Sequence, residues 1–148
     1  MPLILLRPRK KVSSQRGSIL VEMAFALPII AIIFIIAVDL GLAVREHQLL
    51  QNAAREAARF ASLPPGDATD AEIQQRVINY CAGEGITVNP ADVTINRYYI
   101  DPAAVPAVYA TEITVSYTTQ MLLLGAPVLP SGNVTLTGRS VFRNTYAY

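Results

Sequence analysis

The distribution of apolar residues divides the chain into one long helical region and several shorter elements. Residues 23–38, MAFALPIIAIIFIIAV, carry no charge, and the wider stretch 18–44 is interrupted only by Glu22 and Asp39. As a helix, this stretch would extend for about 40 Å, which exceeds the hydrocarbon core of about 30 Å in a typical bilayer. Pro28 removes one helical hydrogen bond, which membrane helices tolerate. The pattern therefore predicts a transmembrane helix over residues 18–44.

The helical pattern continues beyond this membrane segment. Residues 43–62 contain no proline or glycine and are rich in good helix formers. Five alanines recur there at intervals of four residues, in two rows: Ala53, Ala57 and Ala61, and Ala54 and Ala58. Small side chains at this spacing allow another helix to approach closely, although the same stripe could pack on the chain's own domain. LPPG at residues 63–66 ends the pattern, so we predict one helix over residues 18–62.

The pattern of residues in the rest of the chain predicts a small external α+β domain within residues 45–148. TDAE at residues 69–72 has the form of a capping box, with Thr69 as the N-cap residue and Glu72 bonding back to it. The short helix that follows has an apolar face, which we assign to Ile73, Val77, Tyr80 and Cys81.

Three segments with alternating apolar residues follow this helix, at residues 92–99, 111–119 and 133–143. Strands that succeed one another without an intervening helix favour an antiparallel sheet, on which the long amphipathic helix would pack. Gly138 is expected to mark a β-bulge in the last strand. The apolar stretch 121–129 is too short to span a membrane and would be either buried or at the membrane surface.

Charge is distributed unevenly along the chain. The first 17 residues contain five of the 12 basic side chains and none of the 11 acidic ones, so the remainder is net negative. By the positive-inside rule, the basic residues 1–17 stay in the cytoplasm and the C-terminal domain lies on the other side of the membrane. The absence of a basic folded surface argues against a nucleic-acid partner.

A cleaved secretory signal peptide is the alternative interpretation of this N-terminal region. LGLA at residues 40–43 resembles a signal-peptidase site. However, the apolar core here is longer than the apolar region of a signal peptide, which usually has about 7–15 residues. Asp39 also stands just before the site, and the helical pattern runs through it.

No catalytic or metal-binding motif is present in the sequence. Cys81 is the single cysteine, so an internal disulfide and a multi-cysteine metal site are excluded. His47 has no serine or cysteine partner in a recognisable motif and is expected to be solvated. We therefore expect no enzyme activity and no cofactor.

The basic leader, Gly17, and SILVE with Glu22 at the fifth position after that glycine resemble a type IV prepilin signal. More narrowly, residues 16–62, with the segment LQNAAREAAR, resemble the TadE-like family, the minor pseudopilins of the tight-adherence (Flp) type IVb pilus. The resemblance implies a pilin-like fold and a bacterial inner-membrane precursor whose C-terminal domain is periplasmic. It also implies cleavage between Gly17 and Ser18 by a prepilin peptidase. The implied partners are this peptidase, other pilin subunits, the pilus assembly machinery and membrane lipid, with incorporation into the pilus as a further expectation.

The resemblance further implies a role for Glu22 in assembly. A carboxylate within a bilayer is costly, by about 2.5–3.5 kcal/mol for Asp at the centre and less near an end. Cleavage after Gly17 would create an α-amino group on Ser18, with which Glu22 of a neighbouring subunit could pair. Two alternatives remain: Glu22 extends to the membrane interface without a partner, or the chain is an uncleaved single-span membrane protein whose external domain binds an envelope partner.

Overall fold

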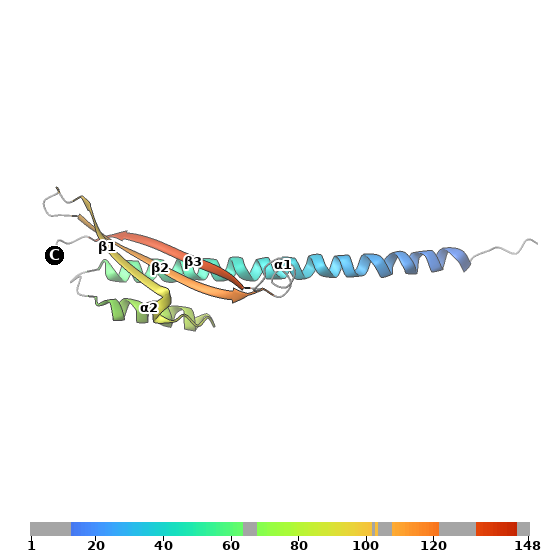
Figure 1. The fold of residues 1–148 in the computed structure, drawn as a ribbon, viewed down its shortest axis with the longest axis horizontal. Coiled ribbons are helices and arrows are strands. Elements are labelled where there is room, and N and C mark those ends of the chain that lie inside the picture. Colours follow the sequence, from blue (N-terminus) through green and yellow to red (C-terminus); the bar gives the residue numbers. More distant parts are fainter. Residues whose placement is uncertain (1–12, 64–67, 102, 104–107, 122–132, 145–148) are drawn as a thin grey trace, which may run out of the picture.

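The computed structural model describes residues 13–63, 68–101, 103, 108–121 and 133–144 (Figure 1). In chain order, the elements are α1 (Ser13–Ala61), α2 (Asp70–Gly83), a 3₁₀ turn (Pro90–Asp92), β1 (Val93–Asp101), β2 (Val108–Gln120) and β3 (Asn133–Arg143). The three strands form one antiparallel sheet in the order β1-β2-β3. The predicted α+β class is therefore confirmed. Of the apolar stretch 121–129, all but Met121 lies outside the described residues.

Helix α1 is a single unbroken element of 49 residues with Pro28 inside it. At 1.5 Å per residue it extends for about 74 Å, and its N-terminal half projects well beyond the rest of the molecule (Figure 1). The prediction of one helix through residues 18–62 is confirmed. The helix also begins earlier than predicted, at Ser13.

Helix α2 begins with the predicted capping box. The Thr69 backbone N–H donates to Glu72 Oε2 at 2.8 Å, and the Glu72 N–H donates to Thr69 Oγ1 at 3.3 Å. Ile73, Val77 and Cys81 are fully buried, as predicted for the apolar face. Tyr80 is 38% exposed, so assigning it to this face was wrong. The other three repeat at intervals of four residues, and Tyr80 stands one residue out of that row, which turns it toward solvent.

The β2–β3 ladder is regular through Gly138, which pairs with Val115, so the predicted bulge is wrong. A Cβ at Gly138 would lie 2.4 Å from the backbone carbon of Leu50 and 2.7 Å from the Gln51 nitrogen. Glycine is needed here because the strand lies directly on the backbone of α1. The irregularity of the sheet instead occurs in β1, between Tyr99 and Asp101.

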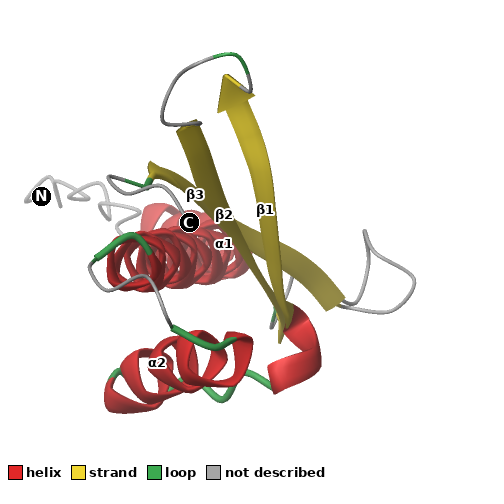
Figure 2. Cartoon of the chain, turned by 90° about the vertical axis from the view of Figure 1, so that its left-hand side faces the viewer, coloured by secondary structure: helices red, strands yellow, loops and turns green. Residues whose placement is uncertain are grey.

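Both helices lie on one face of the sheet, as the view along α1 shows (Figure 2). The core between these layers contains Leu50 from α1, Val77 from α2, and Ile113 and Val115 from β2, all fully buried. Each large apolar side chain buried in this way contributes about 1.5–3 kcal/mol relative to exposure. The opposite face of the sheet is polar, and its exposed residues include Thr94, Asn96, Thr118, Thr135 and Thr137.

Polar contacts connect α2 to its neighbours. Arg97 of β1 donates to Asp70 at 2.6 Å and to the Ala68 carbonyl at 3.2 Å. Arg76 of α2 reaches Glu56 of α1 at 3.0 Å. These side chains are partly exposed, so each ion pair contributes little, and burial of the apolar face does most to hold α2 in place.

Candidate functional site

The N-terminal half of α1 exposes apolar side chains around its whole circumference. Examples are Phe25 at 73%, Ile33 at 62% and Phe34 at 69% exposure. Among the described residues, one helix, Gly17–Ala61, is long and apolar enough to cross a membrane. This fits a single-pass membrane protein, because exposed surface of this kind is unfavourable in water and favourable in lipid.

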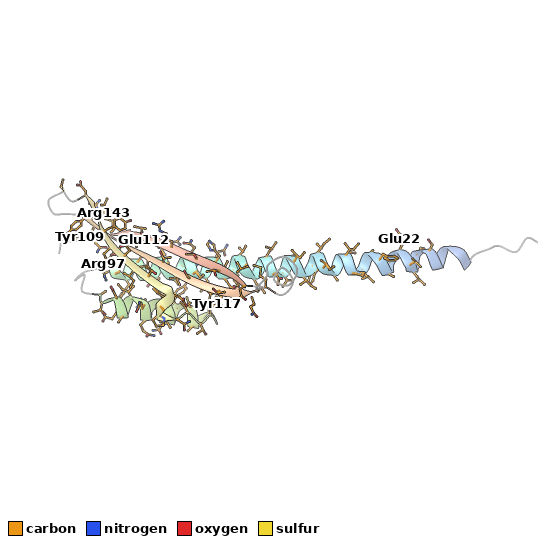
Figure 3. All side chains as sticks on the ribbon, viewed as in Figure 1. Glu22, Arg97, Tyr109, Glu112, Tyr117 and Arg143 are labelled. Atoms are coloured by element: carbon orange, nitrogen blue, oxygen red, sulfur yellow. The ribbon has the colours of Figure 1, made fainter. Side chains whose placement is uncertain are left out.

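Gly17, Ser18 and Glu22 all lie in the first turns of α1, and all are exposed. Glu22 is far from the α+β domain, on the part of the helix that touches no other described element (Figure 3). A Cβ added at Gly17 would meet nothing within 4 Å. Ser18 and Glu22 are separated by four residues, which places them about 6 Å apart along the axis and on the same face of the helix. No other described part of the chain competes for this face.

The five alanines of α1 are buried within the chain's own domain. Their exposures are 0% for Ala54, Ala57 and Ala58, 1% for Ala53 and 4% for Ala61. They belong to the core formed with α2 and the sheet. Of the two interpretations of this stripe, packing on the chain's own domain accounts for all five positions. Their small size lets β3 and α2 approach the helix backbone.

The structure also shows a feature that the sequence pattern did not predict. It lies at Asp39, where the apolar N-terminal part of α1, the membrane half, meets the α+β domain. Asp39 is only 6% exposed, although Val38 and Leu40 on either side are 45% and 50% exposed. A pocket of ≈ 100 Å³ lies here, lined by Asp39, Leu42, Ala43 and Glu46 of α1 and by Thr119, Gln120 and Met121 at the end of β2. Within it, Glu46 Oε2 is buried without a hydrogen-bond partner. The sequence signal was Asp39 itself, an acid that interrupts an apolar run.

The opposite end of the domain has an exposed cluster of aromatic residues near the tip of the β1–β2 hairpin. The rings of Tyr99 and Tyr109 are in contact, with centroids 4.3 Å apart and planes tilted by 39°, and the Tyr109 hydroxyl donates to that of Tyr99 at 2.7 Å. This hydrogen bond raises the pKa of Tyr109. Tyr98 and Ile100 are also exposed.

The part of the chain that the structure describes contains no cluster of residues that could form a metal site. No group of three or more histidine, cysteine or acidic residues comes together among those residues. His47 is exposed on α1, as expected. Cys81 is buried, and that burial raises the pKa of its thiol, which makes it a poor nucleophile.

Comparison with known proteins finds a family match over most of helix α1. Residues 17–59 match the TadE-like protein family. The resemblance seen in the sequence is thus confirmed for the segment that contains Gly17, Ser18, Glu22 and four of the five buried alanines. A TadE-like segment relates the chain to pilus assembly, in a family of structural rather than enzymatic proteins. No curated protein and no solved structure matches the chain.

Proposed function

We propose that the chain is a minor pilin-like subunit of a tight-adherence (Flp) pilus, made as an inner-membrane precursor and cleaved after Gly17 by a prepilin peptidase. The observation that carries the proposal is the position of Glu22, an exposed carboxylate on the membrane half of a TadE-like helix. It lies one turn beyond the residue that cleavage would turn into the N-terminus. Nothing else in the described chain contacts that turn.

Cleavage after Gly17 is tested by the mass of the mature protein. Protein from cells that express the cognate peptidase should begin at Ser18, whereas a start at Met1 or Val44 would contradict the proposal. A start at Met1 would instead favour the uncleaved single-span protein. Gly17→Ala should slow processing slightly and Gly17→Leu should accumulate precursor. Because the space around Gly17 is open, neither substitution should disturb the fold, and a defect reports recognition by the peptidase.

The proposed orientation places the N-terminus in the cytoplasm and the external domain in the periplasm. The asymmetry of basic residues supports it, since those of the leader precede the apolar helix. A reporter that is active only in the periplasm should be active when fused after Tyr148. Activity of a cytoplasm-only reporter at that position would contradict this orientation.

Glu22 serves assembly rather than folding in this proposal. The Ser18 amine of one subunit would pair with Glu22 of a neighbour, where little water competes with the interaction. Glu22→Ala should still be inserted and cleaved, because a neutral side chain enters the membrane more easily. It should lose association with partner subunits, because their buried amines are left unpaired. Glu22→Asp should recover part of the association, since its carboxylate is one methylene shorter.

The measurement is co-purification of tagged variants with pilin partners, together with a count of surface pili. A peptidase-processed band must be seen first, so that degradation is not mistaken for failed assembly. Met23→Ala is a matched control, because it removes a larger exposed side chain from the adjacent position without removing a charge. Assembly of Glu22→Ala at the wild-type level would show that Glu22 does not pair with the amine of a neighbouring subunit. Pairing between Ser18 and Glu22 of the same subunit would also give that result.

A further inference from the structure

We propose that the external domain rests directly on the leaflet of the membrane from which α1 emerges, with the end of the sheet near Gln120 and Asn133 in the lipid headgroup layer. This inference depends on α1 crossing a membrane, as in the proposed function. It adds the position of the domain and identifies a second lipid-contacting surface outside the helix.

The first argument is the length of the apolar part of α1. Residues 19–38 form 20 positions of helix, and at 1.5 Å per residue they extend for about 30 Å, the thickness of a bilayer core. When they fill the core, Asp39 lies at its boundary on the domain side. Glu22 then lies about 5 Å inside the opposite boundary, where the cost of its charge is well below the cost at the centre.

The second argument is that the exposed side of α1 remains apolar beyond Asp39. Leu40 and Leu42 are each 50% exposed and Val44 is 55% exposed, and Arg45 is the first basic residue after them. From Asp39 to Val44 the helix rises by about 8 Å. The headgroup layers bring a bilayer to about 40–45 Å, which leaves about 5–8 Å on each side of the core. Residues 39–44 therefore match the thickness of one headgroup layer.

The third argument is that the sheet already reaches this level of the helix. Thr119, Gln120 and Met121 line one pocket together with Asp39 and Glu46, so the end of β2 packs on the same turns that cross the headgroup layer. This end of the sheet lies toward the membrane half of α1 (Figure 1). Because α1 is unbroken from the apolar run into the domain, no linker separates the sheet from the membrane.

The chemistry of this end suits uncharged contact with headgroups. Gln120 and its partner Asn133 are exposed amides, and Met121 adds a half-buried apolar side chain. The first basic residue along β3 is Arg139, about 20 Å further along the strand, and it is paired with Glu112. With no cationic side chain at these positions, the contact should form on zwitterionic lipid and should not require anionic lipid.

Spin labels on β3 test the inference in the full chain reconstituted in phosphatidylcholine nanodiscs. Asn133→Cys, Thr137→Cys and Val141→Cys all replace exposed residues on the outer face of one strand, at steps of about 13 Å. Phe34→Cys reports the membrane core. The unsubstituted chain, carried through the same labelling, shows whether buried Cys81 contributes any signal.

A trace of nickel-chelating lipid in the disc should relax the Asn133 label several-fold more strongly than the Val141 label, with Thr137 between them. A water-soluble nickel complex should give the opposite order, and oxygen should reach the Asn133 label freely, which separates lipid contact from burial by protein. Equal relaxation of all three β3 labels, with Phe34 still in the core, would overturn the inference and leave the membrane span intact. A Phe34 label in water would instead contradict the span itself, and the proposed function with it.

Discussion

Helix α1 has two halves with the same backbone and opposite surroundings. In the membrane half, residues such as Ile33 and Phe34 are bulky and more than 60% exposed. In the domain half, Ala54, Ala57 and Ala58 are small and fully buried. The helix is continuous through both halves, and the difference lies in what covers each: α2 and the sheet pack on the domain half, and no other described element covers the membrane half.

This difference shows how one element serves as both membrane anchor and core. The large exposed side chains of the first half offer apolar area to lipid. In the second half, alanines leave room for the sheet to come so close that Gly138 contacts the backbone of Leu50. The domain half of α1 therefore supplies a large part of the hydrophobic core of the domain.

The rate at which a thiol reagent modifies Cys81 reports the stability of the domain. The effects of substitutions in the two halves of α1 can therefore be compared on this one measure. Cys81 is the single cysteine, and it is buried in the core against α1. Modification requires the domain to open, and the opened fraction rises tenfold for about every 1.4 kcal/mol of stability lost. The full chain can be studied in nanodiscs by this method.

The largest effect is expected when a large side chain is removed from the domain half. Leu50→Ala should destabilise the domain by about 2–5 kcal/mol, because Leu50 is fully buried. Cys81 modification should then accelerate by more than about tenfold. Ile33→Ala is the matched change in the membrane half and should leave the rate unchanged. Equal acceleration by both variants would show that the two halves are not independent.

The reverse change, from a small to a large side chain, should again affect the modification rate only when it is made in the domain half. Ala57→Leu inserts three carbons where the exposure is 0%, and overpacking of this kind costs about 1–3 kcal/mol. Ala24→Leu makes the same change at an exposed position of the membrane half and should have no effect on Cys81. If Ala57→Leu left the rate unchanged, the close approach of the sheet and α2 to this helix would be wrong.

A somewhat smaller effect is expected at the contact between sheet and helix. Gly138→Ala places a Cβ against the Leu50 backbone, which should cost about 1–3 kcal/mol of overpacking. Alanine also lowers the conformational entropy of the unfolded chain, which offsets about 0.4–1 kcal/mol of the overpacking cost. Thr137→Ala, at the adjacent exposed position, controls for strand propensity. Thermal unfolding followed by circular dichroism should show a lower Tm for Gly138→Ala alone.

The smallest effect is expected at the capping box, which lies in neither half of α1. Thr69→Ala should destabilise the domain by about 1 kcal/mol, because it removes an N-cap hydrogen bond. Hydrogen bonds from the Thr69 backbone and hydroxyl lower the pKa of Glu72. The stabilisation from Glu72 is therefore complete above its ordinary pKa and is lost as the pH falls through the lowered value. Glu72→Gln should consequently differ from wild type at neutral pH and converge with it in acid, as measured by unfolding at a series of pH values.

Local patterns in the sequence were enough to predict the elements of the fold. The apolar run and the absence of helix breakers predicted α1, TDAE predicted the start of α2, and alternation predicted all three strands. The candidate residues Gly17, Ser18 and Glu22 also came from a short local motif, and the TadE-like match covers them. Each of these signals depends on neighbours within a few residues, which the sequence displays directly.

Only the tertiary structure decided what each surface faces. Glycine inside a strand is compatible with a bulge or with a close approach, and the position of Leu50, 88 residues away, selected the second. The alanine stripe could have packed on another helix or on the chain's own domain, and the structure shows the second. Tyr80 lies outside the buried face of α2, and Asp39 is covered by the end of β2. These outcomes depend on contacts between segments that are distant in the chain, and hydrophobic periodicity identifies a buried face without specifying what covers it.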